Sequence, residues 1–215
     1  MLHPFMTIEE INNEVNEEFH KLEIEVDRVI NRYYNNERIR FKIDKENPYI
    51  KGYPYRTAKG NLCHIILYKW DGVKEYNGYD DASYTIVMPF EDWTGVRAVV
   101  ITKTMKYVYN TAFFSSYNLQ MNPRQKGPLD KMIHYFKKNA LTVGGLIVAY
   151  DKEVYQTFSL DGAAFGRMEG LLVVVDNFIQ NIHLTEVHTA TKERLNAELH
   201  LDRVRINSTP SSTAI

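Results

Sequence analysis

Apolar residues at steps of three and four predict a long helix near the start of the chain. The helix begins at Thr7-Ile8-Glu9-Glu10, which matches a capping box in which Glu10 reaches back to the Thr7 amide. The apolar stripe then runs to about Asn35 and consists of Ile8, Ile11, Val15, Phe19, Leu22, Val26, Val29 and Tyr33. Such a stripe suits either a coiled-coil seam or a groove on the body of the same chain, and the pattern does not choose between them.

Beyond residue 36 the apolar period changes to two, which is typical of strands. The expected strands are 38–43, 63–70, 83–88, 97–103, 105–109, 145–150, 154–160, 164–168 and 171–178. Turn pairs such as Asp71-Gly72 and Asp161-Gly162 separate neighbouring runs, so we expect antiparallel meanders. Residues 44–62 contain two prolines and two glycines and are expected to form a long loop.

Two further helices complete the predicted fold. The first covers 128–139, with Pro128 in the first helical position and a buried face made of Leu129, Met132, Ile133 and Phe136. The second covers 184–201. The chain is therefore expected to be α+β, with an N-terminal helix or arm (1–36), a globular domain (37–206) and a flexible polar tail (207–215).

Composition narrows the function classes only a little. Apolar residues make up 44% of the 215, and the formal net charge of -1 argues against a protein that nucleic acid or anionic lipid attracts by overall charge. Cys63 is the only cysteine, so neither an intrachain disulfide nor a zinc site built on several thiolates can form. The longest apolar run, 171–175, is too short to span a bilayer, and the N-terminus lacks a signal-peptide pattern. We expect a cytoplasmic protein.

The sequence offers no convincing catalytic motif. The seven histidines lack the three-, four- or seven-residue spacing to a complete set of metal ligands, and the glycines do not form a phosphate-binding loop. No Gly-x-Ser-x-Gly motif is present either. We therefore expect no metal and no cofactor.

The most distinctive stretch mixes aromatic and basic residues within 48–61. Its candidate binding residues are Tyr49, Lys51, Tyr53, Tyr55, Arg56 and Lys59. Such a mixture can stack bases and neutralise phosphates, or it can supply a protein-binding surface of large contact area. Tyrosines that only pack onto the sheet would explain the same composition.

Several short motifs between about residues 107 and 188 resemble a group of uncharacterised proteins of gut Bacteroidetes and their phages. The motifs are Phe113-Phe114-Ser115-Ser116-Tyr117-Asn118, Tyr135-Phe136-Lys137-Lys138-Asn139, the turn from Asp161-Gly162 to Gly166, and Asn177-Phe178-Ile179. In that group a strand enters a short helix with a His-x-x-x-Arg-Tyr-x-x-Arg signature. Ala112, Ser116 and Gln120 stand here in place of the histidine and both arginines. If those groups act on phosphate in the relatives, this chain has lost them.

Two hypotheses follow. The first is a non-catalytic interaction or assembly protein, with a protein partner or self-association through the N-terminal helix. A phage or mobile-element accessory or a virion component would fit, and the protein would then be packaged in a virion. The alternative is a small metal-independent ribonuclease of bacterial-toxin type, with RNA as partner, Tyr53 and Tyr55 stacking bases, and catalytic candidates His64, Arg97, Lys103 and His134.

Overall fold

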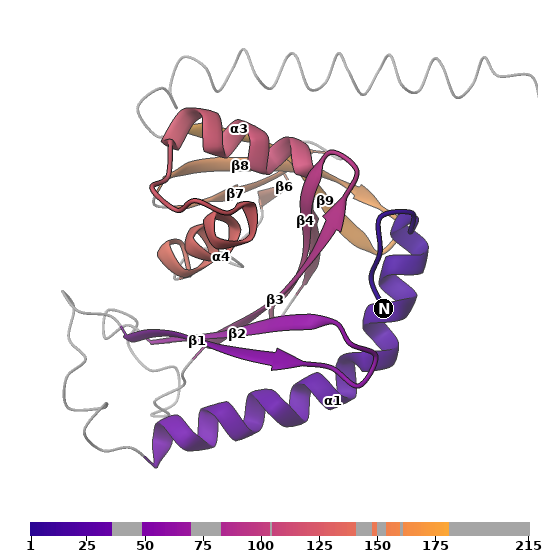
Figure 1. Ribbon diagram of the computed structural model, residues 1–215, viewed down its shortest axis with the longest axis vertical. Helices are drawn as coiled ribbons and strands as arrows, with labels where there is room; N and C mark the ends of the chain where they lie inside the picture. The colour runs from indigo at the N-terminus through magenta and orange to yellow at the C-terminus, as the bar shows by residue number, and fades with distance from the viewer. Residues whose placement is uncertain are drawn as a thin grey trace, which may run out of the picture.

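A computed structural model describes residues 1–35, 49–69, 83–103, 105–140, 148–149, 154–159 and 161–180. Within this part of the chain one nine-stranded sheet lies between helix α1 on one face and helices α3 and α4 on the other (Figure 1). The predicted α+β class is confirmed. None of the described helices is long and apolar enough to cross a membrane.

Helix α1 (Ile8–Tyr34) begins as its capping box predicts. The Thr7 amide donates to Glu10 Oε2 at 2.7 Å, and the Glu10 amide donates to Thr7 Oγ1 at 3.2 Å. The apolar stripe is buried against the sheet, in one core cluster with residues from β2, β3, β4, β5 and β9. Of the two roles that the stripe allowed, the structure therefore shows the groove on the body of the same chain.

The sheet consists of two antiparallel meanders joined by one parallel pairing. The first meander comprises β1 (Tyr49–Arg56), β2 (Leu62–Lys69), β3 (Ser83–Asp92), β4 (Gly95–Ile101) and β5 (Lys106–Tyr109). The second comprises β6 (Val148–Ala149), β7 (Val154–Phe158), β8 (Gly162–Glu169) and β9 (Leu172–Gln180). Strand β5 pairs with β9 in parallel, which gives the order β1-β2-β3-β4-β5-β9-β8-β7-β6.

The second face of the sheet carries an aromatic core under α3 (Thr111–Met121) and α4 (Pro128–Lys138). Tyr109, Phe113, Tyr117 and Tyr135 are almost fully buried there and make edge-to-face ring contacts, such as that between Tyr117 and Tyr135 at 4.8 Å. Helix α4 confirms the prediction over 128–139, although Leu129 proves 37% exposed and lies outside the buried face.

Two expectations from the pattern require correction. The prediction of a long loop over 44–62 is wrong. Tyr49–Arg56 forms β1, and the residues that follow it form the turn into β2. Proline is tolerated in this strand because β1 is the outermost strand of the order at that end. Periodicity also missed α3, which only the resemblance had implied. The segments predicted at 38–43, 71–81, 184–201 and 207–215 lie outside the described residues.

Candidate functional site

The four catalytic candidates of the ribonuclease hypothesis do not all lie on one face of the sheet. His64 lies between the α1-side residues Cys63 and Ile65 of β2, so its side chain points to the opposite face, on which α4 carries His134. Burial, helped by the charge of Lys137, lowers the pKa of His64. Arg97 lies two residues before the α1-side residue Val99 and stacks over Phe90 at 5.4 Å, so it lies on the α1 side of the sheet, opposite to His64. Lys103 is exposed beyond the end of β4.

The six predicted binding residues fall on β1 and on the turn that follows it. Tyr53 and Tyr55 are partly buried against the α1-side core, and Lys51 lies over the Tyr53 ring at 5.2 Å. Arg56 donates to the carbonyl of Gly60, and Lys59 pairs with two glutamates of α1. Tyr49 begins β1. The rings of Tyr53 and Tyr55 therefore pack onto the sheet, the alternative to binding that the composition allowed.

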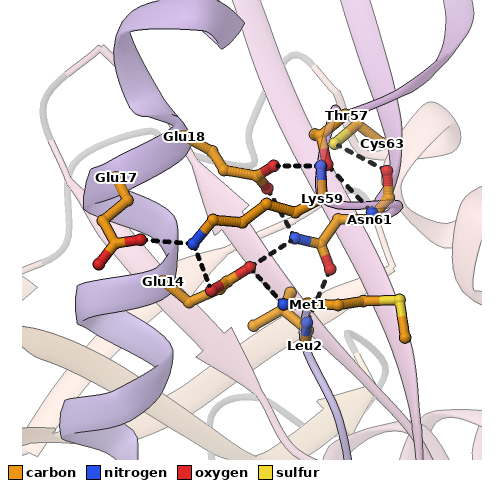
Figure 2. A network of polar contacts seen from close by, with 9 residues as sticks. All are labelled: Met1, Leu2, Glu14, Glu17, Glu18, Thr57, Lys59, Asn61 and Cys63. Atoms are coloured by element: carbon orange, nitrogen blue, oxygen red, sulfur yellow. Dashed lines mark hydrogen bonds and ion pairs between the residues drawn. The ribbon is translucent and has the colours of Figure 1, made fainter.

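A polar network ties the turn between β1 and β2 to α1 and to the start of the chain (Figure 2). The Asn61 side-chain amide donates to Glu14 Oε1 at 3.1 Å and to Glu18 Oε2 at 2.6 Å. Asn61 Oδ1 accepts from the Leu2 amide at 2.7 Å, and Lys59 Nζ lies 2.9 Å from Glu14 Oε2. Three segments distant in sequence are thus fixed together by one asparagine.

The Glu14 carboxylate of this network is stabilised in its charged form. Burial tends to raise the pKa of Glu14, but hydrogen bonds from the N-terminal ammonium, Lys59 and Asn61 outweigh it and lower the pKa to about 2. Glu18 is 3% exposed and accepts from both Asn61 and the Lys59 amide. The network stabilises the fold, because each carboxylate accepts hydrogen bonds from donors of a neighbouring segment.

Asp161 forms a second structural clamp under α3 and α4. Its carboxylate accepts from the Tyr117 hydroxyl at 2.9 Å and the Asn139 amide at 3.0 Å, and it pairs with Lys138. Burial tends to raise the pKa of Asp161, but the hydrogen bonds from Lys138, Asn139 and Tyr117 lower it below the usual value. Asp161 was predicted only as a turn residue, and its spacing gave no sign that it joins two helices to the sheet.

A third polar group crosses the sheet where the two meanders meet. Arg97 Nε donates to Asn110 Oδ1 at 3.1 Å, and Asn110 Nδ2 donates to Asp176 Oδ1 at 2.5 Å. Asp176 lies where the register between β8 and β9 shifts, at the bulge beside Phe165 and Gly166. Burial raises the pKa of Asp176, against the opposing effect of the Asn110 hydrogen bond. Among the described residues, no group of three or more His, Cys, Asp or Glu could hold a metal ion.

Among the described residues, two exposed aromatic side chains lie in contact on the surface, and no sequence motif pointed to them. Phe5 and Trp93 are 69% and 75% exposed, and their rings meet edge to face at 5.0 Å. Trp93 lies in the turn between β3 and β4, and Phe5 lies in the segment before α1. No periodicity marks either residue, because each lies outside the helices and strands. Their proximity follows from the tertiary fold alone.

Comparisons with protein-family models, with curated proteins and with solved structures found no match.

Proposed function

We propose that the protein acts by binding another protein, without catalysis, through the surface formed by Phe5 and Trp93. Large aromatic side chains bury much apolar area at little entropic cost, and tryptophan is enriched among residues that dominate binding energy. Exposed on a well-packed fold, two such rings in contact are the observation that carries the proposal.

Both rings are held in place by anchored neighbours, which favours binding. Leu2 is buried and hydrogen-bonded to Asn61, and Met6 packs against the α1-side core, so the short segment that carries Phe5 is anchored on both sides. On the other side, Thr94 Oγ1 donates to Thr111 Oγ1 at 2.9 Å and fixes the turn beside Trp93 to the start of α3. A surface ordered before it meets its partner loses less entropy on binding.

The proposal differs from the sequence hypothesis in where contact is made. The apolar stripe of α1 is covered by the sheet of its own chain, so self-association through that stripe would need α1 to leave its groove. The pair of aromatic rings needs no such rearrangement. An assembly encoded by a phage or mobile element, as the resemblance implies, remains part of the proposal.

Site-specific photo-crosslinking in the native host tests it. A photoreactive phenylalanine analogue placed at position 5 or 93 should give defined protein adducts that mass spectrometry identifies. The matched control is position 119, because Leu119 on α3 is 85% exposed and lies away from the pair. If positions 5 and 93 give no more adducts than position 119, the proposal is wrong. An adduct of twice the chain mass would identify a second copy as the partner.

A further inference from the structure

We propose that a phosphate group binds between His64 of β2 and Lys137 of α4, on the face of the sheet that carries α4. The site shares no residue with the Phe5–Trp93 surface, so the inference goes beyond the function proposed above. It is carried by two basic side chains that different elements bring together, without a carboxylate partner in the described part of the chain.

The Lys137 side chain lies against β1 because Gly52 leaves room for it. A Cβ atom at Gly52 would lie 2.6 Å from Lys137 Cε and 3.2 Å from Lys137 Nζ, which is too close for any other residue unless the lysine moved. Helix α4 lies on the side of the β1–β2 hairpin opposite to α1 (Figure 1). Although Lys137 is exposed, its ammonium group is therefore held next to the strand.

His64 lies close to that point on the neighbouring strand. It pairs with Pro54, two residues from Gly52, and its side chain points to the α4 face. Burial, and after it the positive charge of Lys137, lowers the pKa of His64, so the half-buried imidazole is neutral at neutral pH. A neutral imidazole still donates one hydrogen bond. The two side chains together offer a donor and a full positive charge to one ligand.

No carboxylate neutralises this pair among the described residues. Within this part of the chain neither the His64 nor the Lys137 side chain makes a hydrogen bond or an ion pair. Asp130, the one carboxylate of α4, precedes Lys137 by seven residues, which is about 10 Å along a helix. The adjacent Lys138, in contrast, pairs with Asp161. Lys137 therefore keeps a charge that an anion can use.

A phosphate group matches these two side chains. Its oxygen atoms accept the imidazole hydrogen bond while its charge pairs with the ammonium group, and lysine is a common phosphate ligand in proteins. His134 precedes Lys137 by three residues, so it lies on the same side of α4 and borders the site. A bound dianion would place an opposite charge beside the imidazole and favour its protonation. Phosphate binding should therefore raise the pKa of His64.

Proton NMR of the histidine rings in the full chain provides the test, because His64 reports directly on its own site. Sodium phosphate is added at constant ionic strength, with sodium chloride as the reference. Phosphate should shift the His64 ring signals in a saturable way and raise the pKa of His64, and chloride should do neither. His64→Gln identifies these signals among those of the seven histidines.

Three variants test the geometry. Lys137→Gln should weaken phosphate binding about tenfold or more, because it removes a charged hydrogen-bond partner. Gly52→Ala should also weaken binding, because the new Cβ displaces the end of the lysine side chain. Lys126→Gln is the matched control, since it removes the same charge at an exposed position before α4 and should leave binding unchanged. Both lysine variants should keep the melting temperature of the wild type, because both positions are exposed.

The choice of ligand distinguishes the source of the phosphate. Adenosine monophosphate and a short single-stranded RNA are added in place of inorganic phosphate. The ligand that saturates the His64 shift at the lowest concentration is assigned as the source, and equal responses assign the site to free phosphate.

Three results would overturn the inference: no saturable shift of the His64 signals, the same shift with chloride, or equal losses from Lys137→Gln and Lys126→Gln. The crosslinking experiment at positions 5 and 93 uses other residues. Its outcome therefore decides the proposed function independently of this site.

Discussion

The side-chain amide of Asn110 donates a 2.5 Å hydrogen bond to Asp176 and so connects the end of β5 to the bulge in β9. The backbone strengthens the same junction, because the Asn110 amide donates to the Val175 carbonyl at 2.9 Å. These bonds continue the short parallel ladder between Tyr107–Tyr109 and Val173–Val175. The junction between the two meanders is therefore held by side chain and backbone together.

Asp176 should make the protein less stable as pH rises. Burial raises its pKa in the folded state, so the folded state binds the proton more tightly than the unfolded state does. The free energy of unfolding should therefore fall as pH rises from the usual aspartate pKa through the raised one. Asp176→Asn should lack this loss and be at least as stable as the wild type at neutral pH. Urea unfolding at a series of pH values measures the free energy of unfolding of both proteins, with Asp130→Asn, a change at an exposed position, as control.

Gly166 should not tolerate a side chain. A Cβ atom there would lie 2.2 Å from the carbonyl oxygen of Val174, which belongs to the neighbouring strand and cannot move aside without breaking the ladder. Gly166→Ala should lower the free energy of unfolding by about 2–3 kcal/mol. Gly170→Asn is the control, because nothing lies within 4 Å of that position and asparagine tolerates its positive φ. Equal effects of the two changes would contradict the close approach.

Asn61→Asp should lower the free energy of unfolding more than Asn61→Ala does. Asn61 donates to both Glu14 and Glu18, and aspartate would place a third carboxylate against them with no donor between. Loss of the donors that satisfy the buried Glu18 should cost about 3 kcal/mol in Asn61→Ala, and repulsion should add to this in Asn61→Asp. Because acid neutralises the added carboxylate, the difference between the two variants should shrink as pH falls. Denaturant unfolding at neutral and acid pH would show whether it does.

The Cys63 thiol should report the opening of the first meander. It is fully buried on β2, and burial raises its pKa to about 12, so the reactive thiolate is scarce at neutral pH. Iodoacetamide should label the native protein far more slowly than the unfolded chain, with a rate that rises as denaturant increases. Since no other cysteine competes, mass spectrometry reads this site alone. Native labelling as fast as that of a short cysteine peptide would contradict the burial.

Local signals predicted the parts of the fold that depend on neighbours in sequence. The capping box and apolar stripe fixed α1 almost to the residue, and alternation located most of β2, β4 and β9. Helix α3 was missed because the apolar residue Leu119 lies on its exposed face, so the buried residues Phe113, Phe114 and Tyr117 do not contrast with a polar face. The parallel pairing of β5 with β9 could not be predicted either, since strand order depends on contacts distant in sequence.

The site residues were harder to predict for the same reason. The tyrosines of β1 stood out by composition, yet Tyr53 and Tyr55 are used partly for packing. Phe5 and Trp93 are separated by most of the first meander and acquire meaning only when the fold brings their rings together. In the sequence, Asp161 looks like an ordinary turn residue and Asp176 like an ordinary strand residue. A single sequence does not show which hydrogen-bond donors will surround them in the fold.

Because a single parallel ladder joins the two meanders, the chain could be divided into two fragments, one for each meander. Among the described residues, every other strand pairing joins neighbours within one meander, so a break at 122–127, between α3 and α4, would separate the meanders without interrupting any ladder. Two fragments expressed together should then reassociate through β5 and β9 and their shared aromatic core. Fused to the halves of a reporter, they would turn the integrity of this one junction into a signal that can be followed in living cells.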